Sequence, residues 1–158
     1  MFERVLVPLD GSKVGEAALP VIGQLVDKMA PGAKIELILI GVITLLRHWV
    51  VVGEASAPVS YTEEELKIIR DRVLDYLTKS GESLKSKGIT VRTIVNTGNA
   101  AEEILKAAHE NKADLIAMST HGRSGLRRLA FGSITDKVLR GSHVPVLMVR
   151  APEGTVNE

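Results

Sequence analysis

The chain has 158 residues, which suits one domain with a sizeable hydrophobic core. It carries 20 Lys and Arg against 19 Asp and Glu, and this near-neutral balance argues against a dedicated nucleic-acid binder. The sequence has no cysteine, which excludes a disulfide scaffold, a cysteine nucleophile and a thiolate metal site.

No stretch of the sequence has the pattern of a membrane or export segment. The longest uncharged apolar run, Leu37 to Leu46, is too short to cross a bilayer, which takes about 20 residues. The first residues include Glu3 and Arg4 and lack the long apolar region of a signal peptide. We therefore expect a soluble cytoplasmic protein that contacts neither membrane nor nucleic acid.

The first forty residues predict a strand, a helix and a second strand. Val5-Leu6-Val7 is a short apolar run that Pro8 stops, because proline cannot donate to a sheet ladder. Apolar residues then recur at helical spacing from Val14 to Met29, and Ile35 to Val42 is again continuously apolar. Strand, helix and strand with short connections are typical of a parallel crossover.

The segment from Ile43 to Ser60 gives no clear prediction. Trp49-Val50-Val51-Val52 is apolar, whereas the residues after it are typical of a loop. The apolar stretch around Trp49 is therefore either a contact surface for another molecule or buried within its own subunit.

Two helices in the second half of the chain have recognisable starts. Thr62 with Glu65 forms a capping box, and the helix after it carries an apolar stripe, interpreted as core packing, to an end near Gly88. Ile89 to Val95 is a third strand, and Asn99 caps the next helix.

The last part of the chain predicts two further strands around one helix. Leu115 to Met118 is the fourth strand and Val144 to Val149 the fifth. Between them a helix begins at Gly132-Ser133, and we expect it to turn Ile134, Val138 and Leu139 inward.

Alternating strands and helices predict an α/β fold, a three-layer sandwich around a five-stranded parallel sheet. We expect one domain over residues 1–150 and a flexible tail over residues 151–158. In such sheets ligands bind beyond the carboxyl ends of the strands, where the strand order reverses. Pro8-Leu9-Asp10 and the stretch Ser119 to Gly125 both follow strands of this sheet.

The residues after the fourth strand suit an anion. Gly122, Gly125 and Gly132 free the backbone, and Gly132-Ser133 at a helix start would point amide N–H groups and a hydroxyl at a phosphate. Arg123, Arg127 and Arg128 add positive charge. A flexible surface loop with a solvated basic face and an ordinary serine cap is the alternative. The P-loop and dinucleotide fingerprints are absent, which excludes a P-loop NTPase.

These motifs together resemble the universal stress protein family. The resemblance rests on the opening run Val5 to Ser12, on Ala113 to Ile116, on Gly122-x9-Gly132-Ser133 after Met118-Ser119-Thr120-His121, and on the ending Val144 to Val149. It covers essentially the whole chain and is weakest between Ile43 and Ser60. It implies a Rossmann-like fold of the adenine nucleotide alpha hydrolase type, with strand order 3-2-1-4-5.

The resemblance also implies the residues of a nucleotide site. ATP-binding members carry G-x2-G-x9-G-[ST] after the fourth strand; here Ser119 replaces the first glycine, and many members have His where this chain has Gly41. The adenosine pocket would use Pro8 and Asp10, with the Asp10 carboxylate on a ribose hydroxyl, and the backbone of Val42 would recognise adenine. Ribose and phosphates would meet Ser119, Thr120, His121, Gly122, Arg123, Ser124, Gly125, Gly132, Ser133, Ile134 and Thr135.

The implied ligand is ATP, with ADP, AMP and cyclic AMP as alternatives, and Mg or Mn would arrive only through the phosphates. The four histidines are scattered without ligand-like spacing, so the protein itself is not expected to hold a metal. The family pairs its last strand with that of a second copy, which implies a homodimer through Val144 to Val149. No catalytic signature is present, so we expect a stress-response regulatory or protective module with at most slow ATP hydrolysis.

Several alternatives stay open at this point. Asp10 is either a ribose ligand or only a helix cap, and Ser119 either tolerates or weakens nucleotide binding. A nucleotide-free dimeric module that captures an unknown protein partner is the second hypothesis. An adenylyl-transfer enzyme on the same fold is the third, and a hydrolase built from Ser119, Ser124 or Ser133 with His121 and Asp10 lacks the G-x-S-x-G turn.

Overall fold

The alternating side chains of the central strand divide the core into two faces. The computed structural model describes residues 2–29, 34–45, 48–52, 55–120 and 132–155. In β1 (Arg4–Pro8), Val5 and Val7 pack into one hydrophobic cluster, and Leu6 between them packs into the other. This is the period-two alternation of a strand covered on both sides.

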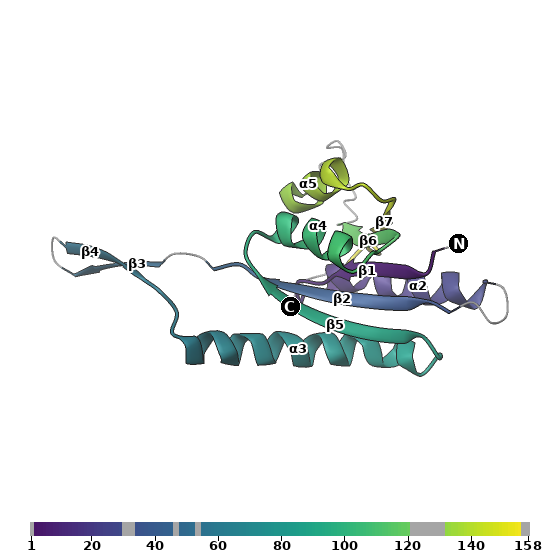
Figure 1. The fold of residues 1–158 in the computed structure, drawn as a ribbon, viewed down its shortest axis with the longest axis horizontal. Helices are drawn as coiled ribbons and strands as arrows, with labels where there is room; N and C mark the ends of the chain where they lie inside the picture. Colours follow the sequence, from purple (N-terminus) through teal and green to yellow (C-terminus); the bar gives the residue numbers. More distant parts are fainter. Residues whose placement is uncertain (1, 30–33, 46–47, 53–54, 121–131, 156–158) are drawn as a thin grey trace.

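The sheet has the predicted topology. Besides β1 it contains β2 (Glu36–Ile43), β5 (Thr90–Thr97), β6 (Leu115–Thr120) and β7 (Val146–Arg150), and every neighbouring pair is parallel. The spatial order is β5-β2-β1-β6-β7, visible in Figure 1. Counted along these five strands alone, this is the order 3-2-1-4-5, so the predicted fold class is confirmed.

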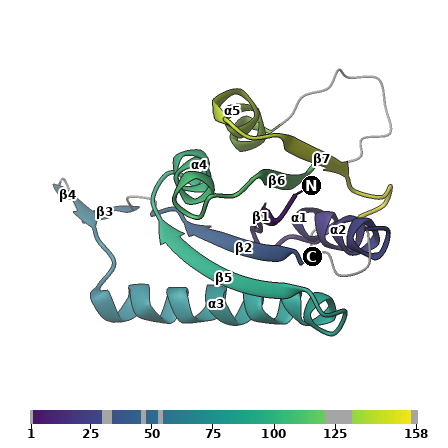
Figure 2. The ribbon, with the colours of Figure 1, turned by 45° about the vertical axis from the view of Figure 1, so that its right-hand side comes forward.

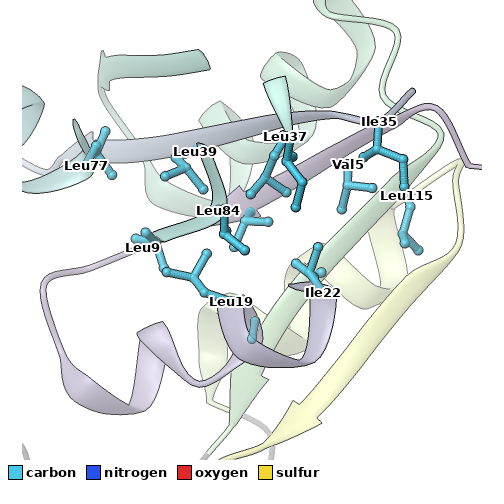
Figure 3. Packing of buried hydrophobic residues seen from close by; sticks show 14 of the residues in the cluster. Val5, Leu9, Leu19, Ile22, Ile35, Leu37, Leu39, Leu77, Leu84 and Leu115 are labelled. Carbon is cyan, nitrogen blue, oxygen red and sulfur yellow. The ribbon is translucent and has the colours of Figure 1, made fainter. Parts of the chain in front are cut away.

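Helices cover both faces of the sheet. One cluster combines the sheet with residues of α2 (Ala18–Asp27) and α3 (Glu63–Lys85), as Figure 3 shows for Leu19, Ile22, Leu77 and Leu84. The other includes α4 (Ala100–Glu110) and Val138 of α5 (Ser133–Gly141). No helix within the described residues is long and apolar enough to cross a membrane.

The first predicted helix is divided in two. A short α1 (Lys13–Glu16) ends at Ala17, and α2 begins at the next residue. Pro20 explains the break, because its ring would clash with the carbonyl of Glu16 in a continuous helix. Pro20 is tolerated in the first turn of α2, because N–H groups in a first turn have no acceptor within the helix and none is lost there.

The two predicted helix starts are confirmed. The Thr62 hydroxyl accepts from the Glu65 backbone N–H at 3.2 Å, and the Glu65 carboxylate accepts from the Thr62 N–H at 2.8 Å. The Asn99 side chain accepts from the Glu102 N–H at 3.3 Å. Gly88 follows α3 with φ +81°, a left-handed conformation that glycine adopts without strain.

The segment without a clear prediction contains an antiparallel hairpin. Its strands are β3 (His48–Val52) and β4 (Ala55–Val59), paired from His48↔Val59 to Val52↔Ala55. The pair forms a sheet of its own, and Figures 1 and 2 show it standing away from the main sheet.

The expectation for the last helix is wrong at two of three positions. Val138 is fully buried, but Ile134 is 44% exposed and Leu139 39% exposed. Because α5 covers only the outer end of the sheet and packs on α4, only a narrow stripe of α5 is buried. Ile134 lies in the first turn, where it lines the cavity described below instead of the core.

Gly41 has a packing role between β2 and α3. A Cβ built at this position would lie 2.5 Å from Cγ1 of Val73 and 3.5 Å from Cδ1 of Leu77, both on α3. The missing side chain therefore lets α3 approach β2 closely.

Candidate functional site

The sheet opens at the position where its strand order reverses. β1 pairs with β6 only at Val5↔Leu115 and Leu6↔Ile116, although both strands continue beyond these pairs. On its other side β1 pairs with β2 along its whole length. Pro8 cannot donate toward β6, and a crevice at this reversal point is the usual ligand position in open α/β sheets.

A cavity of about 300 Å³ lies at this opening. Every described residue of the predicted site lines it: Pro8, Asp10, Val42, Ser119, Thr120, Gly132, Ser133, Ile134 and Thr135. The remaining predicted site residues, His121, Gly122, Arg123, Ser124 and Gly125, lie outside the described residues. The structure thus brings together three segments far apart in sequence, from β1, from the end of β2, and from β6 to the start of α5.

Sequence reasoning missed the apolar part of this lining. Ile40 precedes Val42 by two residues and therefore faces the same side of β2, a signal that strand periodicity offers. Ala100 and Ile104 come from α4, and Met118 from β6. Their contribution depends on how α4 packs over the sheet, which no local pattern of the sequence reveals.

Asp10 forms the turn that starts α1. Its Oδ1 accepts from the Ser12 backbone N–H at 3.0 Å and from the Ser12 hydroxyl at 2.6 Å. The Ser12 Oγ in turn accepts from the Gly15 N–H at 2.9 Å, which caps the helix. Asp10 is thus linked to the helix cap through Ser12, and Oδ2 is the carboxylate oxygen that this turn does not use. A ribose contact by the same residue stays a prediction.

Gly15 allows the Asp10 carboxylate to lie against α1. A Cβ at Gly15 would be 2.6 Å from Oδ1 of Asp10 and 3.3 Å from Oγ of Ser12. Gly15 also lines the cavity. Only glycine therefore fits at this position without displacing the Asp10 carboxylate, and the sequence alone does not reveal this.

Ser119 uses its hydroxyl within the protein. Its Oγ donates to the Gly15 carbonyl at 3.0 Å and so ties β6 to α1 across the mouth of the crevice. The Ser119 side chain is half-buried and lines the cavity at the same time. Its role in the described structure is to hold α1 in place.

The start of α5 offers backbone donors to the cavity. Its N-cap is Gly132, without a side-chain cap bond, whereas Ser12, Thr62 and Asn99 cap α1, α3 and α4 with their side chains. The first helical bond of α5 runs from the Asp136 N–H to the Gly132 carbonyl, so the N–H groups of residues 133–135 precede it. These residues line the cavity, and free N–H groups with the positive helix end favour an anion.

Gly132 itself is not required by the backbone. Its φ is −58°, which any residue adopts, and no described atom lies within 4 Å of the position its Cβ would take. Among the described residues, a side chain at this position would therefore meet no close neighbour. Within the described residues no group of three His, Asp or Glu side chains is arranged to hold a metal ion.

Comparison with known proteins identifies the family. The family model described as "Universal stress protein family" matches residues 1–150. The chain belongs to the universal stress protein family. The chain is 30% identical over 150 residues to universal stress protein YxiE of Bacillus subtilis, covering 95% of this chain and all of that protein. It is 28% identical over 159 residues to universal stress protein MJ0577 of Methanocaldococcus jannaschii.

Solved structures of this family share the fold. The MJ0577 structure superposes with a TM-score of 0.70 at 25% identity, covering 98% of this chain and 99% of that one. Two more distant structures carry ligands. One is a universal stress protein in complex with cAMP, with a TM-score of 0.62 and 21% identity, and covers 96% of this chain and 98% of that one. The other, from Arabidopsis thaliana with AMP bound, has a TM-score of 0.58 and 12% identity, and covers 99% of both chains.

Proposed function

We propose that the strand-end cavity binds an adenine nucleotide, with ATP as the principal ligand. One observation carries the proposal: residues expected at a nucleotide site from three separate segments line one cavity at the reversal point of the sheet. The cAMP- and AMP-bound relatives support the choice of adenine.

The two ends of the cavity suit the two ends of such a ligand. Apolar side chains of Ile40, Val42, Ile104 and Met118 offer a surface for a base, and Asp10 offers a carboxylate for a ribose hydroxyl. The N–H groups at the start of α5 offer donors for phosphate. Mg or Mn would enter with the phosphates of ATP.

The same proposal assigns a non-catalytic role. We infer that the chain acts as a homodimeric regulatory or protective module in the cytoplasm, with at most slow ATP hydrolysis. Support for the dimer comes from β7, which is the edge strand next to β6. Val146, Leu147 and Met148 on it are only partly buried, and an apolar edge strand needs a cover. Pairing with the β7 of a second copy removes the edge.

A glycine series at the start of α5 tests the proposal. Calorimetric titration with ATP, ADP, AMP and cAMP should show binding to the unmodified chain. Gly132→Ala adds a Cβ into open space and should keep the affinity within a few-fold, whereas Gly132→Arg should abolish binding. Circular dichroism checks that both variants fold. No heat at millimolar nucleotide, or full binding by Gly132→Arg, would contradict the proposal.

A further inference from the structure

A second, larger cavity lies away from the strand ends. It has a volume of about 650 Å³ and is lined by α1, α2 and α3, on the sheet face opposite α4. This volume is within the range of small-molecule sites. The strand-end cavity and the proposed nucleotide function leave it unused.

Lysines from two sides surround this second cavity, which we call the α2–α3 groove. Lys13 comes from α1, Lys79 from α3 and Lys87 from the turn that follows α3, whereas Glu16 is the acidic residue in the lining. Each ammonium group is paired with a carboxylate, Lys13 with Glu16 at 3.2 Å, Lys79 with Asp75 at 2.7 Å and Lys87 with Asp27 at 2.7 Å. The lysine side chains are 67%, 69% and 44% exposed. Exposed pairs of this kind contribute little stability, so an anionic ligand can replace the carboxylates.

A buried hydroxyl belongs to the same groove. The Oη of Tyr76 is shielded from solvent, and among the described residues it has no partner in hydrogen-bond geometry. Burial, and next the negative charge of Glu16, raise the pKa of Tyr76 to about 12, so the hydroxyl keeps its proton. The side chains of Glu16 and Ser80 lie close enough to this hydroxyl to influence its pKa, and the Glu16 carboxylate is also paired with Lys13.

We propose that the α2–α3 groove binds a small organic polyanion, carrying two or more carboxylate or phosphate groups, through Lys13, Lys79 and Lys87. Lysines on opposite walls favour a ligand with two separated anionic groups over a single small anion. When the ligand pairs with Lys13, the Glu16 carboxylate is released and can accept the hydrogen bond of Tyr76. This site is separate from the proposed nucleotide function and does not rest on it.

Citrate and inorganic pyrophosphate serve as the carboxylate and phosphate probes. Backbone amide NMR spectra of the full chain are recorded during each titration, with and without saturating AMP. We expect shifts in Lys13, Glu16 and residues 19–24 and 76–87, and these shifts should persist with AMP present, because AMP is proposed to bind in the other cavity. If AMP does not bind, the same shifts still test the groove alone.

Two charge-matched double variants separate binding in the groove from general attraction of anions. Lys79→Gln with Lys87→Gln should weaken binding at least ten-fold, whereas Lys67→Gln with Lys85→Gln, which lie on α3 outside the groove, should leave it within two-fold. Tyr76→Phe should reduce the change in the amide chemical shift of Glu16 when citrate or pyrophosphate binds. Absence of shifts at 10 mM probe, equal loss in both double variants, or shifts confined to the strand-end cavity would overturn the proposal.

Discussion

Substituting Gly15 by alanine should separate the role of this residue in nucleotide binding from its role in stability. The new Cβ would lie 2.6 Å from Oδ1 of Asp10, and this oxygen is the end of an exposed side chain that can rotate away. The backbone is not forced to move. Rotation gives up the two exposed hydrogen bonds from Ser12 to Oδ1, at about 0.5–1.5 kcal/mol each, and the helix preference of alanine over glycine offsets about 0.5–1 kcal/mol of this loss. The free energy of unfolding should therefore fall by at most about 2 kcal/mol.

The effect on affinity should be larger. A rotated Asp10 loses its hydrogen bond to the ligand, and a hydrogen bond to a charged group contributes about 1.5–3 kcal/mol. At 1.4 kcal/mol for each factor of ten, the dissociation constant for AMP should rise roughly 10- to 150-fold. Isothermal titration measures this change, and urea denaturation measures stability on the same preparation.

A double-mutant cycle with Asp10→Ala tests the stated cause. Asp10→Ala alone should cause a similar loss, and Gly15→Ala should add almost nothing in that background, because both substitutions remove one contact. Gly23→Ala, a helical glycine beside Leu84 and away from the strand-end cavity, is the matched control and should leave affinity unchanged. Unchanged affinity in Gly15→Ala, or fully additive losses, would refute the reasoning.

Three further predictions concern α3. Gly41→Ala should lower the free energy of unfolding by about 1–3 kcal/mol, because the new Cβ crowds Val73. Adding Val73→Ala should recover part of this loss. Equal urea midpoints for Gly41→Ala and the unmodified chain would contradict the prediction. Thr62→Ala should cost about 1 kcal/mol through the lost cap in the same denaturation assay. The control Thr78→Ala removes a half-buried hydroxyl that bonds only within the helix, and it should cost less than about 0.5 kcal/mol. The pKa of Tyr76 is raised from 10.0 to about 12 in the folded chain, so its contribution to stability is complete below pH 10 and is lost as the pH rises to 12. The unmodified chain should therefore lose stability more steeply than Tyr76→Phe over that window, and parallel curves would exclude the burial of this hydroxyl.

The sequence predicted those features whose cause is local. The Thr62 capping box, the Asn99 cap and the end of β1 at Pro8 depend on residues a few positions apart, and the structure shows each of them. The strand order was implied by the family resemblance, since periodicity alone does not rank strands within a sheet. The division of the first helix was not predicted, although Pro20 stands inside the helical pattern and offers a local signal for it.

Features that depend on packing between distant segments were not predictable in this way. Gly41 lies against Val73, a residue on another element, and the Ser119 hydroxyl donates to the Gly15 carbonyl on α1. The exposure of Ile134 follows from the position of α5 at the end of the sheet. The α2–α3 groove likewise exists only once three helices are placed together.

The central claim is that the strand-end cavity is the nucleotide site, and a crystal structure of the chain with AMP tests it most directly. The account predicts the base against Ile104 and Met118, the ribose within hydrogen-bond distance of Asp10, and the phosphate at the N–H groups of Ser133 and Thr135. A nucleotide found in the α2–α3 groove, or an empty strand-end cavity in crystals grown with millimolar AMP, would contradict it.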